Sequence, residues 1–301
     1  MAERVLVSRV VPGSRSKSLA ARRARLIGRG VLYIIAIVSA AAFMIPFVWA
    51  VFSSFKSPGD LTSYPPRLFP RVWHPENYVA VFKRVPFARW AWNTLFISVV
   101  ATFGAVLSSS LVGFSFARFR YPGRDIIFLI TLSTMMLPSE VTLIPLYILF
   151  AKIHWLDSFK PLTIPAYFGG GAFLIFMMRQ FFMTIPLDLD EAARIDGASY
   201  LRIFWQIVMP LSTPALATAA VLTFIGNWDN FMGPFIILNT REKFTLAVGI
   251  RYFSSLADPD GVPTQHLLMA SSLMMTIPII ILFFLAQRFF VRGIVMTGIK
   301  G

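Results

Sequence analysis

Residues 191–210, EAARIDGASYLRIFWQIVMP, form a polar interruption between two long apolar runs of the chain. Gly197 is able to adopt the left-handed conformation that ends a helix, and Ser199 is a residue type that caps the next one. After Ser199, apolar residues recur at the i, i+3, i+4, i+7 spacing of one helical face. These residues are Leu201, Phe204, Trp205 and Val208. The stretch therefore predicts a short helix, a sharp turn and a second helix.

The rest of the chain is strongly apolar. Of its 301 residues, 56% are hydrophobic and 14% are charged, and the mean hydropathy is +0.69, which is more apolar than a soluble domain. Six runs reach the length of about 20 residues that a helix needs to cross a bilayer. They lie near 28–52, 91–117, 126–151, 162–183, 211–238 and 267–290. The sequence predicts an all-α polytopic membrane protein with six transmembrane helices, in which residues 184–210 form a loop.

Basic residues indicate how the chain is oriented in the membrane. The first 30 residues contain eight Lys or Arg against one acidic residue, whereas residues 152–161 contain two Lys. The turn after the second run adds Arg118, Arg120 and Arg124. By the positive-inside rule, both termini and the loop 184–210 are expected in the cytoplasm, with residues 1–27 as a basic tail. This distribution accounts for the net charge of +14 without a nucleic-acid partner.

Several kinds of chemistry have no sequence signature here. The chain has no Cys, and it contains no G-x-x-x-x-G-K-[ST] loop with which to hold a nucleotide phosphate. Its three His are widely separated and lack metal-ligand spacing. No catalytic residue, metal site or cofactor is therefore predicted for this chain, and it is not expected to be an enzyme.

The loop resembles the cytoplasmic loop of ABC importer permeases. The pattern in that family is Glu-Ala-Ala, three residues, Gly, nine residues, Ile, one residue and Leu-Pro. This chain matches it at Glu191, Ala192, Ala193, Gly197, Ile207 and Pro210, with Met209 in place of Leu. Residues 93–125 and 244–301 are also similar to carbohydrate-importer permeases, a group that includes the smaller maltose permease subunit. The resemblance covers about residues 28–301.

The resemblance implies a type I ABC importer permease fold with a cytoplasmic coupling helix in a prokaryotic inner membrane. It implies two copies of an ATPase subunit, which bind ATP and Mg²⁺, together with a second, different permease and an extracytoplasmic solute-binding protein. Transport would occur by alternating access, driven by the ATPase. The solute would be a sugar or a related polyol or glycerol-phosphate compound.

The resemblance also implies roles for residues of the loop. Glu191 is expected to contact a basic residue of the ATPase, although it also suits the positive end of a helix. Gly197 is expected to fix the angle between the two helices. Phe204 and Trp205 either fill a cleft of the ATPase or pack on the chain's own helices. The other candidate coupling residues are Ala192, Ala193, Asp196, Ser199, Ile207 and Pro210.

Polar residues inside the predicted spans are candidates for a translocation pathway, because burying them in a bilayer is costly. They are Glu140 in the third run and Asn227, Trp228, Asp229 and Asn230 in the fifth. The amides and the indole ring suit sugar hydroxyls and ring stacking. The alternative is that these residues join helices by hydrogen bonds.

Two further features affect the spans. Pro138 is expected to kink the third run. Gly169–Gly171 in the fourth run permit close helix approach, expected at an interface between two permeases. A secondary, ion-coupled transporter without an ATPase is the main alternative function. An intramembrane enzyme that uses Glu140 and Asp229 as a catalytic pair is a further one.

Overall fold

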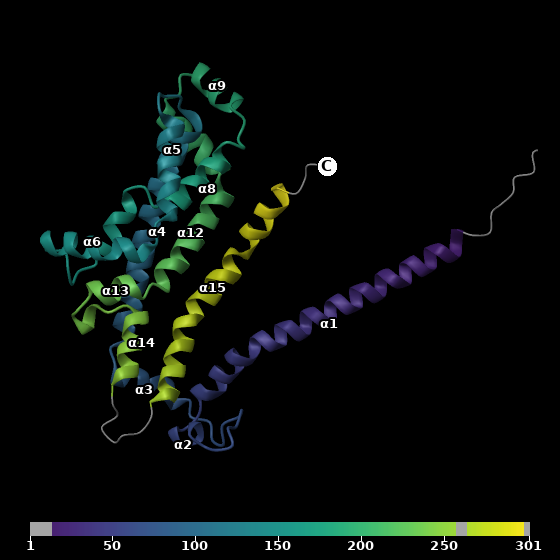
Figure 1. Cartoon of the computed structure of the whole chain (residues 1–301), viewed down its shortest axis with the longest axis vertical. Helices are drawn as coiled ribbons and strands as arrows, with labels where there is room; N and C mark the ends of the chain where they lie inside the picture. Colours follow the sequence, from purple (N-terminus) through teal and green to yellow (C-terminus); the bar gives the residue numbers. More distant parts are fainter. Residues whose placement is uncertain (1–13, 257–263, 298–301) are drawn as a thin grey trace, which may run out of the picture.

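The computed structural model describes the backbone of residues 14–256 and 264–297, with side chains given for these ranges except 14–27, 139 and 288–297. All regular secondary structure in these ranges is helical, which confirms the all-α class. The longest helices are α1 (Ser14–Ser54), α4 (Phe87–Arg118) and α15 (Gln265–Thr297), shown in Figure 1. Because α1 begins at Ser14, it includes part of the predicted basic tail; residues 1–13 lie outside the described ranges.

Shorter helices make up the rest of the fold. Those before the loop are α2 (Pro58–Leu61), α3 (Glu76–Arg84), α5 (Arg124–Ser133), η1 (Thr134–Met136), α6 (Ser139–Lys152), α7 (Lys160–Thr163), η2 (Ile164–Tyr167) and α8 (Ala172–Phe182). Those from the loop onward are α9 (Asp188–Ile195), α10 (Tyr200–Ile203), η3 (Phe204–Val208), α11 (Met209–Leu211), α12 (Thr213–Trp228), α13 (Met232–Ile237), η4 (Arg241–Lys243) and α14 (Leu246–Ser255). Figure 1 shows α9 at one end of the bundle and α2 and α3 at the other.

Membrane-spanning length is reached in two ways. Within the described residues, four helical segments are individually long and apolar enough, and two bent helix pairs bring the total to six if each pair is one span. The single segments are Gly28–Ser54, Phe87–Arg118, Lys160–Phe182 and Gln265–Gln287. The bent pairs are Arg124–Met136 with Glu140–Lys152, at 100°, and Tyr200–Leu211 with Thr213–Trp228, at 80°.

Three predicted runs are interrupted in the structure, and the run 162–183 is divided by the non-helical residues 168–171 between η2 and α8. The run 126–151 breaks at Leu137 and Pro138, which have extended ψ angles of 122° and 136°. Proline disfavours a helical conformation in the residue before it, which accounts for a break here in place of a kink. The run 211–238 is divided because α12 ends at Trp228. A separate helix starts at Met232, where the Asn230 side-chain oxygen accepts the N–H of Gly233 at 3.2 Å.

Helix α4 is central, since it packs against both α8 and α12. The backbone before α8 comes closest at Gly170, which has φ +65°; a Cβ atom there would lie 2.3 Å from the carbonyl oxygen of Ala105 in α4. Only glycine is compatible with this approach. At Gly170, one of the three glycines for which an interface with a second permease is predicted, a close contact is thus made inside this chain.

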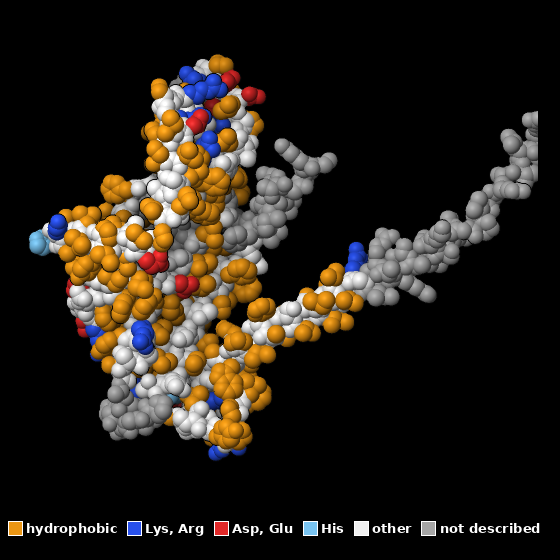
Figure 2. Space-filling model, viewed as in Figure 1, with side chains coloured by type: hydrophobic (Ala, Val, Ile, Leu, Met, Phe, Trp, Pro, Cys, Tyr) orange, Lys and Arg blue, Asp and Glu red, His pale blue; other side chains and the backbone are white. Residues whose placement is uncertain are grey.

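Apolar side chains form one core at each end of α4. The core near α9 contains Phe114, Met178, Phe182, Ile203, Phe204 and Val208. The core near α3 and α14 contains Val81, Trp90, Trp228, Leu246, Phe253 and Leu267. By contrast, the side chains of α1 from Gly28 to Ile45 are exposed, and they give this helix a continuous apolar surface in Figure 2.

At the end of the bundle opposite α9, the segment 241–246 is tied to the start of α4. Trp90 donates its indole N–H to the carbonyl of Arg241 at 2.8 Å, and Asn93 donates to the carbonyl of Glu242 at 2.8 Å. Deeper in the helix, the Thr94 hydroxyl accepts the N–H of Leu246 at 2.8 Å. These three hydrogen bonds hold the segment against the start of α4.

Asp157, in the connection between α6 and α7, holds the neighbouring segment 239–243. Its carboxylate accepts the backbone N–H groups of Asn239 at 3.0 Å and Thr240 at 2.9 Å, and it pairs with Lys243 at 2.8 Å. Partial burial alone would raise the pKa of this carboxyl. The hydrogen bonds from Lys243 and Thr240 outweigh burial and hold the pKa of Asp157 well below its ordinary value.

Because the folded-state pKa of Asp157 is depressed, its contribution to stability is complete above the ordinary carboxyl pKa of about 4 and is lost as the pH falls below it. Asp157→Asn is expected to lower the unfolding free energy by about 1–3 kcal/mol at pH 7, since hydrogen bonds to a charged group are lost. Thermal unfolding in detergent from pH 7 to 3 measures this. The gap between wild type and variant should narrow below pH 4, and a constant gap would contradict the assignment.

Candidate functional site

The loop at the end of the bundle is a helical elbow with a glycine at its corner. Helix α9 ends at Ile195, Asp196 is its C-cap, and Gly197 has φ +80°. Gly197 donates its N–H to the carbonyl of Arg194 at 3.0 Å, and Ala198 donates to that of Ala193 at 2.9 Å. This pair of bonds is the Schellman motif of a helix C-terminus. The sequence prediction of a glycine-terminated helix is confirmed.

The second helix begins as predicted. The Ser199 hydroxyl accepts the N–H of Arg202 at 3.3 Å and caps α10. The chain then continues through the π-helical turn η3 and through Pro210 in α11, and it bends by 80° into α12. The elbow therefore has two changes of direction, at Gly197 and at the start of α12.

Helix α9 exposes both charged and apolar side chains. Glu191, Ala192 and Asp196 are exposed, and Ile195 is 86% exposed. Leu187 and Leu189 are also largely exposed. Large apolar side chains on a short helix at the tip of a molecule are typical of a protein-binding surface. The geometry fits a helix that inserts into a groove on a partner.

The two aromatic residues of the elbow have different environments. Phe204 is 1% exposed and packs edge-on against Phe114, with ring centroids 5.2 Å apart. Trp205 is 48% exposed and lines a cavity of about 400 Å³ between α4 and α12. Phe204 therefore packs on the chain's own helices, which was one of the two alternatives. Ala193 and Ile207 are half-buried against the same core.

The elbow is joined to α4 by a buried ion pair that the sequence did not reveal. Nε of Arg118 lies 2.9 Å from Oδ2 of Asp190, and the two side chains are 2% and 10% exposed. Burial raises the pKa of Asp190, while the positive charge of Arg118 acts in the opposite direction. Arg118 entered the sequence argument only through membrane orientation, because a pairing of residues so far apart has no local signature.

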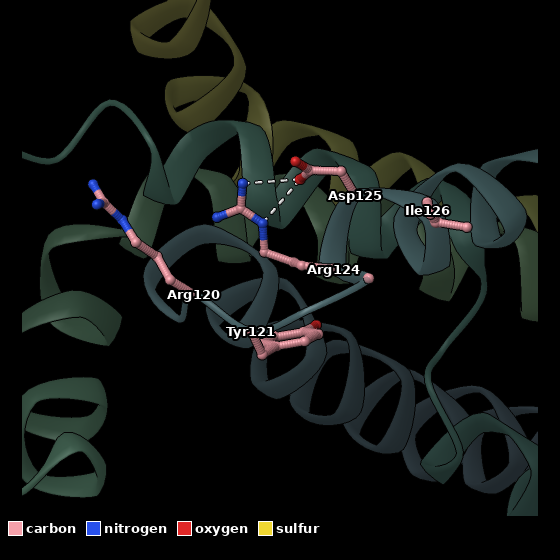
Figure 3. A pocket seen from close by; sticks show the side chains of 6 residues that line it. Arg120, Tyr121, Arg124, Asp125 and Ile126 are labelled. Carbon is pink, nitrogen blue, oxygen red and sulfur yellow. Dashed lines mark hydrogen bonds and ion pairs between the residues drawn. The ribbon is translucent and has the colours of Figure 1, made fainter.

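Arginines gather at the same end of the molecule as α9, where Figure 2 shows a group of blue side chains. The turn between α4 and α5 contains a cavity of about 590 Å³ lined by Arg120, Tyr121 and Arg124 among others. In Figure 3, Arg120 points away from Arg124, which pairs with its neighbour Asp125 at 2.8 Å. The distribution agrees with the side that the positive-inside rule assigns to the cytoplasm.

The candidate pathway residues do not form one site. Asn227 and Asn230 line a cavity of about 210 Å³ together with residues of α6, α7 and α13. Trp228 does not line it: the indole is 3% exposed, stacks on Phe224 and donates its N–H to the carbonyl of Met275 at 3.1 Å. In this chain the Trp228 ring joins α12 to α15, which agrees with the alternative that these residues link helices.

The two intramembrane carboxylates lie outside this cavity. Glu140 is in the first turn of α6, and Asp229 is exposed just after the end of α12. Neither lines the cavity with Asn227 and Asn230. The cavity lined by Asn227 and Asn230 therefore contains neither of the two carboxylates, Glu140 and Asp229, that a catalytic pair would need there.

Comparisons with known proteins agree with this architecture. The family model described as binding-protein-dependent transport system inner membrane component matches residues 109–296. The arabinooligosaccharides transport system permease protein AraQ of Halalkalibacterium halodurans is 34% identical over 228 residues, which are 75% of this chain and 79% of AraQ. The sn-glycerol-3-phosphate transport system permease protein UgpE of Yersinia enterocolitica is 37% identical over 231 residues, 76% of this chain and 80% of UgpE.

A solved structure gives the same fold. A chain of a bacterial ABC transporter involved in the import of the acidic polysaccharide alginate superposes with a TM-score of 0.79 at 25% identity, covering 89% of this chain and 98% of that chain. With its apolar helices, this likeness indicates a multi-pass inner-membrane protein. The relatives are transporter subunits, and no enzyme family is indicated. The chain belongs to the binding-protein-dependent transport system inner membrane component family, the permeases of ABC importers.

Proposed function

We propose that this chain is one permease of an ATP-driven importer for a sugar or a related polyol or glycerol-phosphate compound. The single observation that carries the mechanism is the exposed elbow, in which Glu191 and Ala192 face outward on α9 next to the glycine corner. A family permease with such a surface needs a partner there. An ATPase subunit is the partner we assign, and it would bind the ATP and Mg²⁺.

The complete importer would contain two ATPase subunits, a second and different permease, and an extracytoplasmic solute-binding protein. The arginines around α9 support a cytoplasmic position for that end, and we assign both termini to the same side. The apolar surface of α1 would face lipid or the second permease. Residues 53–90 and 239–256 would then lie on the outer side, where solute arrives.

Transport would proceed by alternating access. Closure of the two ATPase subunits around ATP would displace α9, and the elbow would pass this displacement to the spans. The access of the solute site would then change from one side of the membrane to the other. A chain that responds to its partner in this way needs two global states with different contacts at α9.

The solute class follows from the relatives, which carry arabinooligosaccharides and sn-glycerol-3-phosphate by name. Asn227 and Asn230 offer amide groups that suit hydroxyl groups. Asn227→Ala is expected to raise the apparent KM for the solute by about tenfold, because one hydrogen bond to the solute is lost. Uptake measured against solute concentration tests this in reconstituted vesicles.

The control for that variant is Thr218→Ala, on the same helix. Thr218 bonds the carbonyl of Pro214 and does not line the cavity, so its apparent KM should be unchanged. Equal KM values for Asn227→Ala and wild type would remove Asn227 from the solute site.

The proposal as a whole is tested by purification from native membranes with an affinity tag on this chain. An importer subunit is expected to bring an ATPase and a second permease with it, and the complex should hydrolyse ATP. Solute uptake that is driven by an ion gradient and needs no ATPase would instead favour the secondary transporter.

A further inference from the structure

Helix α9 is joined covalently to the rest of the molecule at both ends, to α8 through residues 183–187 and to α12. The route to α12 passes the left-handed Gly197, continues through α10 and the π-helical turn, and bends by 80° before α12. A further route is the ion pair between Asp190 in α9 and Arg118 at the end of α4. A chain with two changes of direction transmits a push weakly, whereas a direct contact between two helices transmits it without a hinge.

The ion pair is a close contact between two buried charges. Arg118 contacts Asp190 at 2.9 Å through Nε, and its Nη2 donates to the carbonyl of Ile185 at 3.1 Å. The arginine therefore grips both α9 and the segment that leads into it. Because both side chains are buried, removing either partner leaves a buried charge without compensation. The free energy needed to separate the two buried charges therefore holds α9 against α4 when a partner displaces α9.

Helix α4 is the element best placed to use such a link. It packs on α8 and α12, and at its far end it holds the segment 241–246 through Trp90, Asn93 and Thr94. A displacement that enters α4 at Arg118 is therefore delivered across the whole bundle, to the end opposite α9.

We propose that the Arg118–Asp190 pair is the link through which α9 moves α4, and that both residues position the elbow for energy coupling. This inference rests on the proposed importer function. It assigns a role in coupling to two residues that contact neither solute nor nucleotide, and it makes α4 the main receiver of the movement.

The chain offers a matched control pair. Arg124 and Asp125 also form an arginine–aspartate contact, at 2.8 Å, near the same end of the molecule (Figure 3). These two residues are adjacent in sequence, so their contact joins no two helices. Asp125 is largely exposed, and exposed pairs contribute little.

The experiment compares complexes reconstituted with wild type, Arg118→Gln, Asp190→Asn, the double variant, Arg118→Lys and the control Arg124→Gln/Asp125→Asn. Three quantities are measured for each: the ATPase retained on purification, the rate of ATP hydrolysis, and the solute taken up per ATP hydrolysed. Arg118→Lys keeps the positive charge, so it shows whether the charge alone is sufficient or whether the guanidinium group is required.

Each single variant is expected to retain the ATPase and to lower the solute taken up per ATP by about tenfold, within the usual range of coupling between sites. The double variant should be no worse than either single one, since both remove the same link. Arg118→Lys should recover most of the loss, and the control pair should stay within about twofold of wild type.

An unchanged ratio of solute to ATP in both single variants would overturn the inference. The inference would also be overturned if ATPase binding and uptake fell in parallel while the remaining complexes kept the wild-type ratio of solute to ATP. The pair would then serve assembly alone. A wild-type complex without ATP-dependent uptake would instead refute the proposed function.

Discussion

Glu191→Ala is expected to abolish most ATP-driven uptake while the chain still inserts into the membrane and binds the second permease. Glu191 is exposed on α9 and contributes to no core of the chain, so its loss should not affect folding. Truncating one member of a charge pair buried at an interface costs about 2 kcal/mol or more. That corresponds to a loss of about thirtyfold in affinity for the ATPase.

Asp188→Ala is the matched control, since Asp188 is a second exposed carboxylate of the same helix turn. It should retain uptake within about twofold. Equal uptake by Glu191→Ala and wild type in reconstituted vesicles would contradict the role given to Glu191.

The glycine corner should be sensitive to the size of the side chain. Nothing lies within 4 Å of a Cβ built at Gly197, so the chain itself leaves room there, although φ +80° costs a side chain about 1–2 kcal/mol. Gly197→Asp places a charged group where the partner approaches. It is therefore expected to reduce uptake per ATP much more than Gly197→Ala, which shares the backbone cost.

Gly170→Val is expected to prevent folding. The Cβ of the valine would lie 2.3 Å from the backbone oxygen of Ala105. The atoms that it meets belong to the backbone of α4, which is not able to move aside as a flexible side chain would. The conformation at φ +65° adds strain for any side chain, most of all for a β-branched one. The loss in the free energy of unfolding should exceed about 4 kcal/mol, which few point substitutions cause.

The measurement is the yield of monodisperse protein after extraction into detergent, compared with Gly169→Ala. Gly169 also has a positive φ, of +101°, but its nearest neighbour is a side-chain carbon of Ile175 at 3.7 Å. Gly169→Ala should therefore be recovered in useful amounts while Gly170→Val is not. Equal recovery of the two would mean that the approach of α8 to α4 does not determine the fold.

What the sequence predicted well is local. The corner at Gly197 and the cap at Ser199 depend on a few neighbouring residues, and both are found in the structure. The apolar runs give the correct fold class because length and hydropathy determine whether a helix is able to span a bilayer. Their ends are less certain, as Pro138 and the division after Trp228 show.

What the sequence could not predict depends on the tertiary arrangement. Asp190 is one of several carboxylates in the first turn of α9, and nothing in its neighbourhood indicates that it alone is buried against Arg118. Trp228 stands between two asparagines that line a cavity, yet its ring turns to α15. Helix periodicity places neighbouring residues on different faces, but it does not say which face meets which partner.

The central claim is that α9 is the surface that receives the ATPase. Because the chain has no cysteine, one residue at a time is available as a unique crosslinking site. Ile195→Cys places a thiol on α9 at a position 86% exposed, and Tyr64→Cys places one at a position 94% exposed that follows α2, a helix at the opposite end in Figure 1. In the assembled complex, Ile195→Cys is predicted to crosslink to the ATPase and Tyr64→Cys is not. A crosslink to the ATPase from position 64, or none from position 195, would contradict the account.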